Sequence, residues 1–195
     1  MPGAKGNGGE REVARKLEPW WCKVEPGATF IRTPQSGGWS TPQVRQEFRA
    51  SGDIMTTAVR FPFAVEVKRR EGWSPANLVA GKRSPVWGWW RETIVEAREL
   101  GAEPMLWVRK NAARRTGKGS GGGTLPALWT VLLGRDYILG LRDAGIVVVP
   151  DIFWHAETLA PGVDIGGVIP VGFVEHTLLG TDPGKFALQS SWISG

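Results

Sequence analysis

Residues 63–68 read FAVEVK, a short run whose last four residues alternate between apolar and charged side chains. Successive side chains of a β-strand point to opposite faces of a sheet, so this alternation predicts a strand. Val65 and Val67 would then pack into a core, while Glu66 and Lys68 would share the other face. The strand would hold a carboxylate and an ammonium group in fixed positions beside each other.

The segments around this strand predict a mixed α/β domain. Apolar residues at helical spacing indicate helices at residues 10–18, 87–100 and 136–144. Runs of strand length lie at residues 28–33, 52–59, 61–68, 104–109, 125–133, 146–149 and 168–174. We expect 52–59 and 61–68 to form an antiparallel hairpin, and the whole order to give a mixed central β-sheet flanked by helices. Pro19 is expected to end the first helix and Gly101 the second.

The length and composition favour one globular domain. A chain of 195 residues can bury one sizeable core, so we expect a single domain over 1–195, with a core at about 5–144 and a β-rich C-terminal extension at about 145–195. The chain contains no apolar run of the roughly 18 residues that a membrane-spanning helix needs. The single cysteine, Cys22, excludes an internal disulfide and a cysteine-rich zinc site, so we expect an intracellular, reducing setting.

Positive charge is concentrated in the first two-thirds of the chain. Residues 1–120 hold 21 lysines and arginines against 12 acidic residues, whereas residues 121–195 hold 3 against 7. A basic surface attracts polyanions, and phosphate contacts add affinity for nucleic acid without selecting a sequence. A basic surface that merely faces solvent accounts for the charge about equally well.

Tryptophan is unusually frequent, with 11 among 195 residues. We expect most of these side chains in the core or at a subunit interface, because each one buries a large area. Trp39 and Trp73 lie in Gly-, Ser- and Pro-rich segments flanked by charge, and they are the better candidates for stacking on unpaired bases.

Two carboxylates are predicted to meet beside the lysine of the 63–68 strand. Asp53 lies 13 residues before Glu66, and the predicted hairpin would bring the two close at one end. Converging carboxylates repel each other unless a cation lies between them, and magnesium prefers hard oxygen ligands completed by water and phosphate. Asp53, Glu66 and Lys68 thus suggest a site for metal-assisted phosphodiester hydrolysis. Alternatively, Glu-x-Lys in a strand is a common solvated face.

A third acidic residue, Glu10, is predicted on the inner face of the first helix. It precedes Val13 and Ala14 by three and four residues, so it shares their apolar stripe. Burying a carboxylate alone is costly, and a metal at the edge of the core would supply a partner. The alternative is an acid stabilised by the helix dipole at the N-terminus, a role that Glu12 fills as well.

Four segments together resemble the archaeal type of Holliday junction resolvase, within the PD-(D/E)XK nuclease superfamily. They are GGEREVARKL at 8–17, FIRTPQSGG at 30–38, GDIM at 52–55 and FAVEVKRR at 63–70, in the family's order and approximate spacing. With the predicted helix and strand that follow them, the resemblance covers about residues 5–110. It implies a restriction-endonuclease-like α/β core.

The resemblance also implies roles for individual residues. Glu10, Asp53 and Glu66 would coordinate the metal, and Lys68 would be the catalytic lysine. The implied cofactor is Mg²⁺, for which Mn²⁺ would substitute, with no small-molecule cofactor. The residues that would contact DNA near the scissile bond or lie in the catalytic loop are Arg11, Arg32 and Ser36.

Two features depart from the family's pattern. Gly52 stands where the superfamily has its name-giving proline, and the segments 34–52 and 111–195 are longer than in the compact archaeal form. These departures bear on dimer formation and junction specificity more than on nuclease chemistry. By analogy they suggest a phage origin, with the protein acting in the cytoplasm of the host cell.

Further basic residues would extend a DNA-binding surface beside the site. Those that flank the Glu-x-Lys strand and the loop after it are Arg69, Arg70, Lys82 and Arg83. A solvated loop is an equally good interpretation for any one of these four. Those in the Gly-rich basic segment 110–124, which would order on a DNA backbone, are Arg114, Arg115 and Lys118.

Three functions are compatible with these features. The first is a structure-specific endonuclease that resolves four-way DNA junctions as a C2 homodimer, because a junction of near two-fold symmetry calls for two active sites. The second is another PD-(D/E)XK DNA nuclease, of repair or restriction type. The third is a non-catalytic nucleic-acid-binding protein that combines tryptophan stacking with arginine–phosphate contacts.

Overall fold

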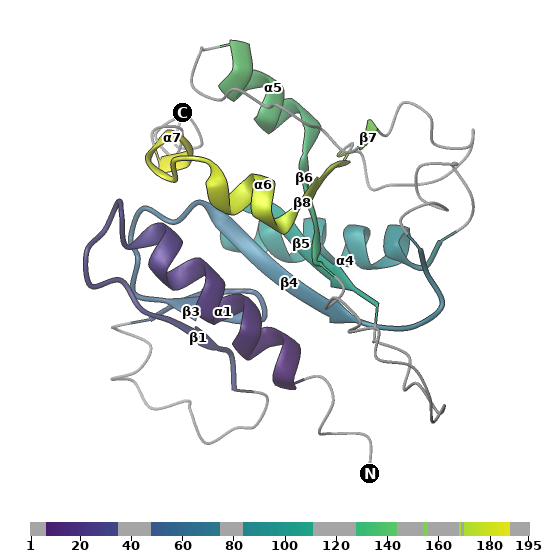
Figure 1. Cartoon of the computed structure of the whole chain (residues 1–195), viewed down its shortest axis with the longest axis horizontal. Coiled ribbons are helices and arrows are strands. Elements are labelled where there is room, and N and C mark those ends of the chain that lie inside the picture. The colour runs from purple at the N-terminus through teal and green to yellow at the C-terminus, as the bar shows by residue number, and fades with distance from the viewer. Residues whose placement is uncertain are drawn as a thin grey trace, which may run out of the picture.

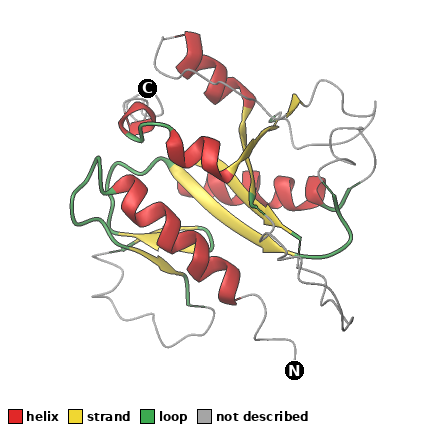
Figure 2. Ribbon diagram, in the orientation of Figure 1, coloured by secondary structure: helices red, strands yellow, loops and turns green. Residues whose placement is uncertain are grey.

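The computed structural model describes residues 7–34, 48–74, 84–110, 128–143, 154–155, 168 and 170–187. A central sheet lies between helices on its two faces (Figures 1 and 2). The helices are α1 (Asn7–Trp21), α4 (Val86–Leu100), α5 (Arg135–Asp143), α6 (Glu175–Gly180) and α7 (Gly184–Ala187). The predicted fold class, a mixed central β-sheet flanked by helices, is confirmed.

Five strands form the central sheet, in the order β4-β5-β6-β8-β7. They are β4 (Phe63–Arg69), β5 (Glu103–Arg109), β6 (Thr130–Gly134), β7 (Trp154–His155) and β8 (Pro170–Val174). β4 and β5 are parallel, joined by the crossover through α4 that a parallel pair needs, and the remaining pairs are antiparallel. Since β4 comes first in this order, one of its edges faces away from β5.

The alternation predicted for β4 is confirmed, and it assigns a face of the sheet to each side chain. Val65 and Val67 lie in the buried cluster that includes α1. The β5 residues in register with Glu66 and Lys68 are Leu106 and Val108, which belong to a second cluster packed on α4. Both charged side chains of β4 therefore emerge on the α4 face.

A second, three-stranded sheet stands in place of the predicted hairpin. Its strands are β1 (Phe30–Arg32), β2 (Arg49–Ser51) and β3 (Ile54–Thr56), antiparallel in the order β1-β3-β2. The hairpin prediction is wrong, because β3 pairs with β1 and β2, while Gly52 meets β4 through an isolated parallel bridge to Val65. An alternating pattern identifies a strand and its buried face but does not choose its neighbour.

The two predicted helix ends have different outcomes. Gly101 ends α4 in the left-handed conformation, with φ 61°, as predicted. Pro19 does not end α1, which runs on to Trp21. A proline inside a helix removes a backbone hydrogen bond, but this one lies in the last turn, followed by two buried tryptophans. The ring of Trp21 packs edge-on against Phe61, and the burial of such rings offsets the local penalty.

The C-terminal part of the chain contributes to the same sheet. The predicted strand at 168–174 is β8, which pairs with β6 beside the core, whereas the predicted strand at 146–149 lies outside the described residues. In the described part of the chain, no helix combines the length and apolar character needed to cross a membrane.

The tryptophans that the structure describes are mostly core residues, as expected. Trp73, predicted as a stacking candidate, is only 4% exposed and packs in the α4 cluster, so it does not offer a face to a base. Trp39 lies outside the described residues.

Candidate active site

Asp53 is held against both flanks of Glu66 at the free edge of β4. Its backbone N–H donates to the carbonyl oxygen of Val65 at 2.8 Å, and its Oδ2 accepts a hydrogen bond from the backbone N–H of Val67 at 2.9 Å. The two carboxyl-bearing residues are thus neighbours, as the sequence predicts. A parallel bridge brings them together, and not a hairpin.

Gly52 permits the close approach of this segment to β4. Its φ is 77°, and a Cβ at this position would lie 2.4 Å from the carbonyl oxygen of Val65. Proline is restricted to a φ of about −65°, so it does not fit this backbone. The replacement of the superfamily's proline by Gly52 therefore has a local physical reason.

Gly52→Ala is expected to lower the free energy of unfolding by about 2 kcal/mol, because a left-handed conformation with a Cβ costs on the order of 1–3 kcal/mol and the contact with Val65 forces the backbone apart. Gly88→Ala is the matched control. Nothing lies within 4 Å of a Cβ at Gly88 in α4, and alanine in a helix gains about 0.5–1 kcal/mol over glycine. Urea unfolding of both variants measures their free energies of unfolding. Equal values for the two variants would contradict the requirement for glycine at position 52.

Glu66 and Lys68 form an ion pair on the α4 face of the sheet. The Nζ of Lys68 also lies 3.6 Å from Oε2 of Glu92 on α4. Glu96 follows one turn later, and its pKa is raised by burial and by the negative charge of Asp53. Neither glutamate is predicted as a site residue from the sequence. Their spacing of four residues is a signal that they share one helical face, but it does not say that this face borders β4 instead of solvent.

Glu10 is buried, with 6% exposure, and its Oε2 accepts a hydrogen bond from Nε of Arg32. The inward orientation agrees with its place on the apolar stripe of α1. Its partner in the structure is a guanidinium group on β1. This bond joins α1 to β1 of the three-stranded sheet. It lies near Asp53, whose pKa responds to the charge of Glu10.

The acidic groups of this centre repel one another. Burial is the largest cause that raises the pKa of Asp53 to about 7, and the negative charges of Glu66 and Glu10 add to it. A backbone hydrogen bond and the charge of Lys68 lower the pKa only in part. The pKa of Glu66 is also raised, by burial first and by the glutamates of α4, despite its ion pair with Lys68. Such mutual repulsion is relieved by added positive charge.

The donor set suits a hard divalent cation, although two of its three carboxylates are paired with cationic side chains of the protein. Buried, mutually repelling carboxylates are the oxygen ligands that magnesium prefers. In the structure, however, Glu10 pairs with Arg32 and Glu66 with Lys68. Among the described residues, no three Asp, Glu, His or Cys side chains surround a common point as metal ligands would. Metal binding would exchange internal ion pairs for bonds to the ion.

The residues predicted to contact DNA are described in part. Arg32 lies beside Glu10, and Arg11 is exposed on α1 one residue further on. At the end of β4, Arg69 is half-buried and Arg70 is exposed. The predicted residues that lie outside the described part are Ser36, Lys82, Arg83, Arg114, Arg115 and Lys118.

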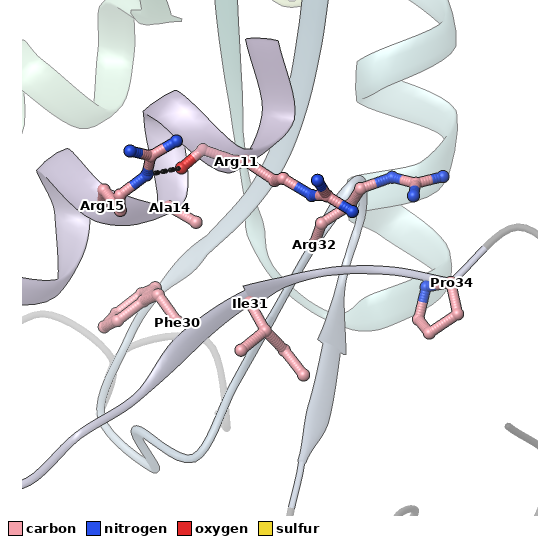
Figure 3. A pocket seen from close by; sticks show the side chains of 7 residues that line it. All are labelled: Arg11, Ala14, Arg15, Phe30, Ile31, Arg32 and Pro34. Carbon is pink, nitrogen blue, oxygen red and sulfur yellow. Dashed lines mark hydrogen bonds between the residues drawn. The ribbon is translucent and has the colours of Figure 1, made fainter. Parts of the chain in front are cut away.

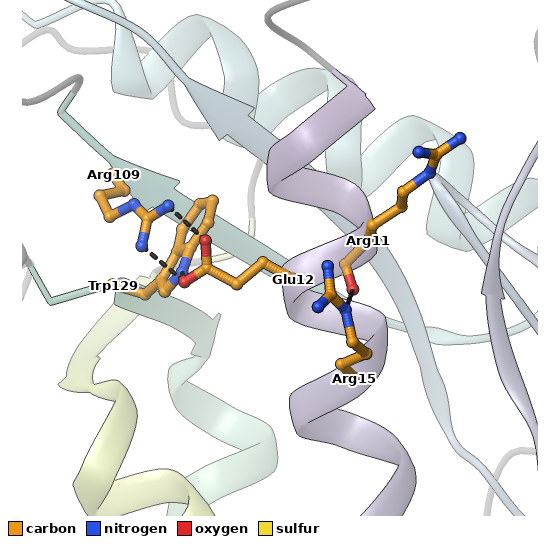
Figure 4. A network of polar contacts seen from close by, with 5 residues as sticks. All are labelled: Arg11, Glu12, Arg15, Arg109 and Trp129. Carbon is orange, nitrogen blue, oxygen red and sulfur yellow. Dashed lines mark hydrogen bonds and ion pairs between the residues drawn. The ribbon is translucent and has the colours of Figure 1, made fainter.

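A second polar network fastens α1 to the end of β5 and to the residue before β6, on the face of the sheet that α1 covers. Figure 4 shows Glu12 pointing toward Arg109 and Trp129, away from Arg11. Both carboxylate oxygens accept hydrogen bonds from Arg109, the Nη1 bond being 2.6 Å, and Nε1 of Trp129 donates to Oε1 at 3.0 Å. The guanidinium carbon lies 4.3 Å from the centroid of the Trp129 ring. Glu12 is thus an anchor and not the helix-capping acid considered from the sequence.

Glu12→Ala is expected to lower the free energy of unfolding by about 1–3 kcal/mol, the usual worth of hydrogen bonds to charged groups. Arg109, only 9% exposed, would lose its counter-charge. Burial alone raises the pKa of Glu12, but the hydrogen bonds from Arg109 and Trp129 outweigh it and lower the pKa. The contribution is therefore present at neutral pH and is lost as the pH falls through the lowered pKa of Glu12.

Urea unfolding at pH 7 and at pH 3 measures this effect. Glu99→Ala, which removes an exposed acid from α4, is the control and is expected to change stability by less than about 0.5 kcal/mol. A Glu12→Ala variant as stable as the control at pH 7 would contradict the anchoring role.

The fold and the centre together define a class of protein. The chain has a β–α–β unit with Glu-x-Lys on its edge strand. A preceding segment places an aspartate beside this strand, and the first helix contributes a buried glutamate. These are the features of a PD-(D/E)XK nuclease with a restriction-endonuclease-like fold.

The family model described as "Phage putative PDDEXK endonuclease" matches residues 3–116, and the chain belongs to this family. The match covers more than half of the chain and includes Glu10, Asp53, Glu66 and Lys68. The chain is therefore a phage-associated nuclease of the PD-(D/E)XK superfamily. No curated protein and no solved structure shows a significant match to it.

Proposed function

We propose that the protein is a magnesium-dependent DNA endonuclease that nicks four-way junctions as a homodimer. The observation that supports the chemistry is the attachment of Asp53 to both flanks of Glu66, within electrostatic reach of Glu10 and Lys68. Glu10, Asp53 and Glu66 would hold the ion, and Mn²⁺ would substitute for Mg²⁺. A bound divalent ion supplies positive charge to the phosphodiester and lowers the pKa of a water ligand.

In this proposal Lys68 acts as a hydrogen-bond donor and a positive charge, and not as a base. Burial lowers the pKa of Lys68, but the ion pair with Glu66 and the charge of Asp53 outweigh burial and raise it. Nζ therefore stays protonated at neutral pH. From there it donates a hydrogen bond to the attacking water or to an oxygen of the phosphate as negative charge develops.

Arginine side chains beside the acidic centre orient the DNA strand. Arg11 is exposed on α1, and Arg32 is adjacent to Glu10. Guanidinium groups form forked hydrogen bonds to phosphate, which hold the backbone without selecting a base sequence.

The junction as substrate is supported by the resemblance of about residues 5–110 to the archaeal type of Holliday junction resolvase. A four-way junction has near two-fold symmetry, so paired cuts require two copies of the centre in a C2 dimer. Recognition would follow the shape and the backbone of the branched DNA. Each copy would hydrolyse one phosphodiester.

Nicking of a labelled immobile four-way junction tests the function against matched linear duplex and flap DNA at equal concentration. The expected result is cleavage of the junction with Mg²⁺ or Mn²⁺, none with EDTA, and much slower cleavage of the other substrates. Equal rates on all of them would support a different DNA nuclease of the same superfamily. Binding without cleavage of any substrate would support a non-catalytic binding protein.

A further inference from the structure

A pocket of about 600 Å³ opens between α1 and β1, on the side of α1 that bears Arg11 (Figure 3). This volume is within the range of about 300–1,000 Å³ that is usual for small-molecule sites. Its walls combine guanidinium groups with apolar side chains. The residues that matter here are Arg11, Arg15, Arg32, Phe30, Ile31 and Pro34.

Three arginines give this pocket a high positive charge. Arg11 and Arg15 are exposed, and in the described part of the chain neither forms an ion pair with a carboxylate. Nε of Arg15 donates to the backbone carbonyl oxygen of Arg11 at 3.2 Å, which turns the side chain along the helix. Arg32 is paired with Glu10, whereas the two exposed guanidinium groups on α1 add positive charge that an anion would offset. The charge therefore favours a phosphate as ligand.

The pocket adjoins the acidic centre through one shared contact. Arg32 lines the pocket and also donates to the carboxylate of Glu10. An anion bound by Arg11, Arg15 and Arg32 would therefore lie beside the centre. A phosphate next to the scissile one on the same DNA strand fits this position.

The apolar side chains of the pocket indicate a ligand that has an apolar part in addition to a phosphate. Phe30 is only 4% exposed and offers no face to a ligand, whereas Ile31 and Pro34 are partly exposed around the pocket. A phosphate gains nothing from the exposed apolar surface of Ile31 and Pro34, whereas the face of a base is stabilised by burying it. A base inside a duplex is stacked and paired, so a base reaches such a recess only when it is unpaired.

We propose that the pocket between α1 and β1 holds one unpaired nucleotide of the DNA strand, with its phosphate on the guanidinium groups of Arg11, Arg15 and Arg32 and its base on Ile31 and Pro34. This proposal rests on the proposed function in that the ligand is DNA, and it adds that an unpaired nucleotide at a branch point is the recognised feature.

Fluorescence anisotropy in EDTA tests the proposal by binding alone, without cleavage. Three labelled four-way junctions are compared: one fully paired, one with unpaired thymidines at the branch point and one with abasic sites in place of these thymidines. The full-length wild-type protein is expected to bind the thymidine junction about tenfold more tightly than either of the other two, a factor that corresponds to roughly 1.4 kcal/mol.

Two variants separate the phosphate from the base. Arg15→Gln is expected to weaken binding of the thymidine junction about fivefold and to leave the paired junction within about twofold. Ile31→Ala is expected to reduce the preference for thymidine over abasic sites about threefold. Arg60→Gln, which removes an exposed arginine beyond the C-terminal end of α1, is the control and should retain the wild-type preferences.

Equal wild-type affinity for the three junctions overturns the proposal. So does an Arg15→Gln variant that weakens binding to all three equally, because the arginine would then be a general phosphate contact. A preference for unpaired thymidine in a protein that does not cleave junctions upholds the pocket while the proposed function fails. Cleavage of junctions by a protein that shows no preference for unpaired thymidine supports the proposed function and overturns the proposal for the pocket.

Discussion

Asp53→Asn is expected to reduce metal-dependent nicking of a four-way junction by about a thousandfold or more while DNA binding survives. The substitution removes one negative charge and keeps the shape of the side chain and an oxygen that accepts the hydrogen bond from Val67. The contribution of a metal to transition-state stabilisation is several kcal/mol, and about 1.4 kcal/mol corresponds to each factor of ten. Glu66→Gln is expected to have an effect of the same size.

Single-turnover nicking with Mg²⁺ measures the loss, and a gel shift in EDTA measures binding. Asp136→Asn is the matched control, because it neutralises an exposed acid at the start of α5, far along the chain from β4. The control should cleave at the wild-type rate. If both site variants cleave as fast as the control, the acidic centre is not the active site.

In the absence of metal, the protein is expected to become less stable as the pH rises from 4 to 8, and Asp53 is expected to cause much of the change. The pKa of Asp53 is raised from 3.8 to about 7, so the folded state favours the protonated acid. This stability is fully present below the unfolded pKa and is lost as the pH rises through the folded pKa. The shift corresponds to a loss on the order of 4 kcal/mol at pH 8.

Urea unfolding in EDTA at several pH values, monitored by tryptophan fluorescence, measures this dependence. Asp53→Asn has no charge to lose, so its stability should fall much less between pH 4 and pH 8, and it should exceed that of the wild type at pH 8. Adding Mg²⁺ at pH 8 should stabilise the wild type more than the variant. Parallel pH profiles for the two proteins would show that Asp53 ionises freely in the folded state.

The sequence predicts the elements of this fold better than their partners. The period-two pattern of residues 63–68 correctly predicts which side chains of β4 face the core, since it is a local property of a strand. The pairing of β3 is not predicted, because a strand at 52–59 satisfies its apolar pattern equally well against β4 or against β1. Asp53 nevertheless lies beside Glu66, because Gly52 alone provides the bridge that the hairpin was expected to provide.

In the candidate site, too, the orientation of single side chains is predicted from the sequence, whereas their partners are not. The inward orientation of Glu10 follows from helical periodicity, and its burial agrees with that prediction. Its pairing with Arg32, and the approach of Glu92 and Glu96 to Lys68 and Asp53, depend on how α1 and α4 pack on separate faces of the sheet. Contacts of this kind join residues far apart in the chain, so no local pattern encodes them.

The ion pair between Glu10 and Arg32 makes the two ligands of the proposed enzyme thermodynamically linked. Arg32 cannot pair fully with Glu10 and with a DNA phosphate at the same time. Likewise, Glu10 cannot pair fully with Arg32 and also bind a metal ion. If a DNA phosphate binds Arg32, the carboxylate of Glu10 loses its partner and becomes available to a metal ion. If a metal ion binds Glu10, the guanidinium group of Arg32 becomes available to a phosphate. By reciprocity, each ligand raises the affinity for the other by the same factor. If the proposed function holds, the protein without DNA would bind the metal ion less tightly than the protein with DNA.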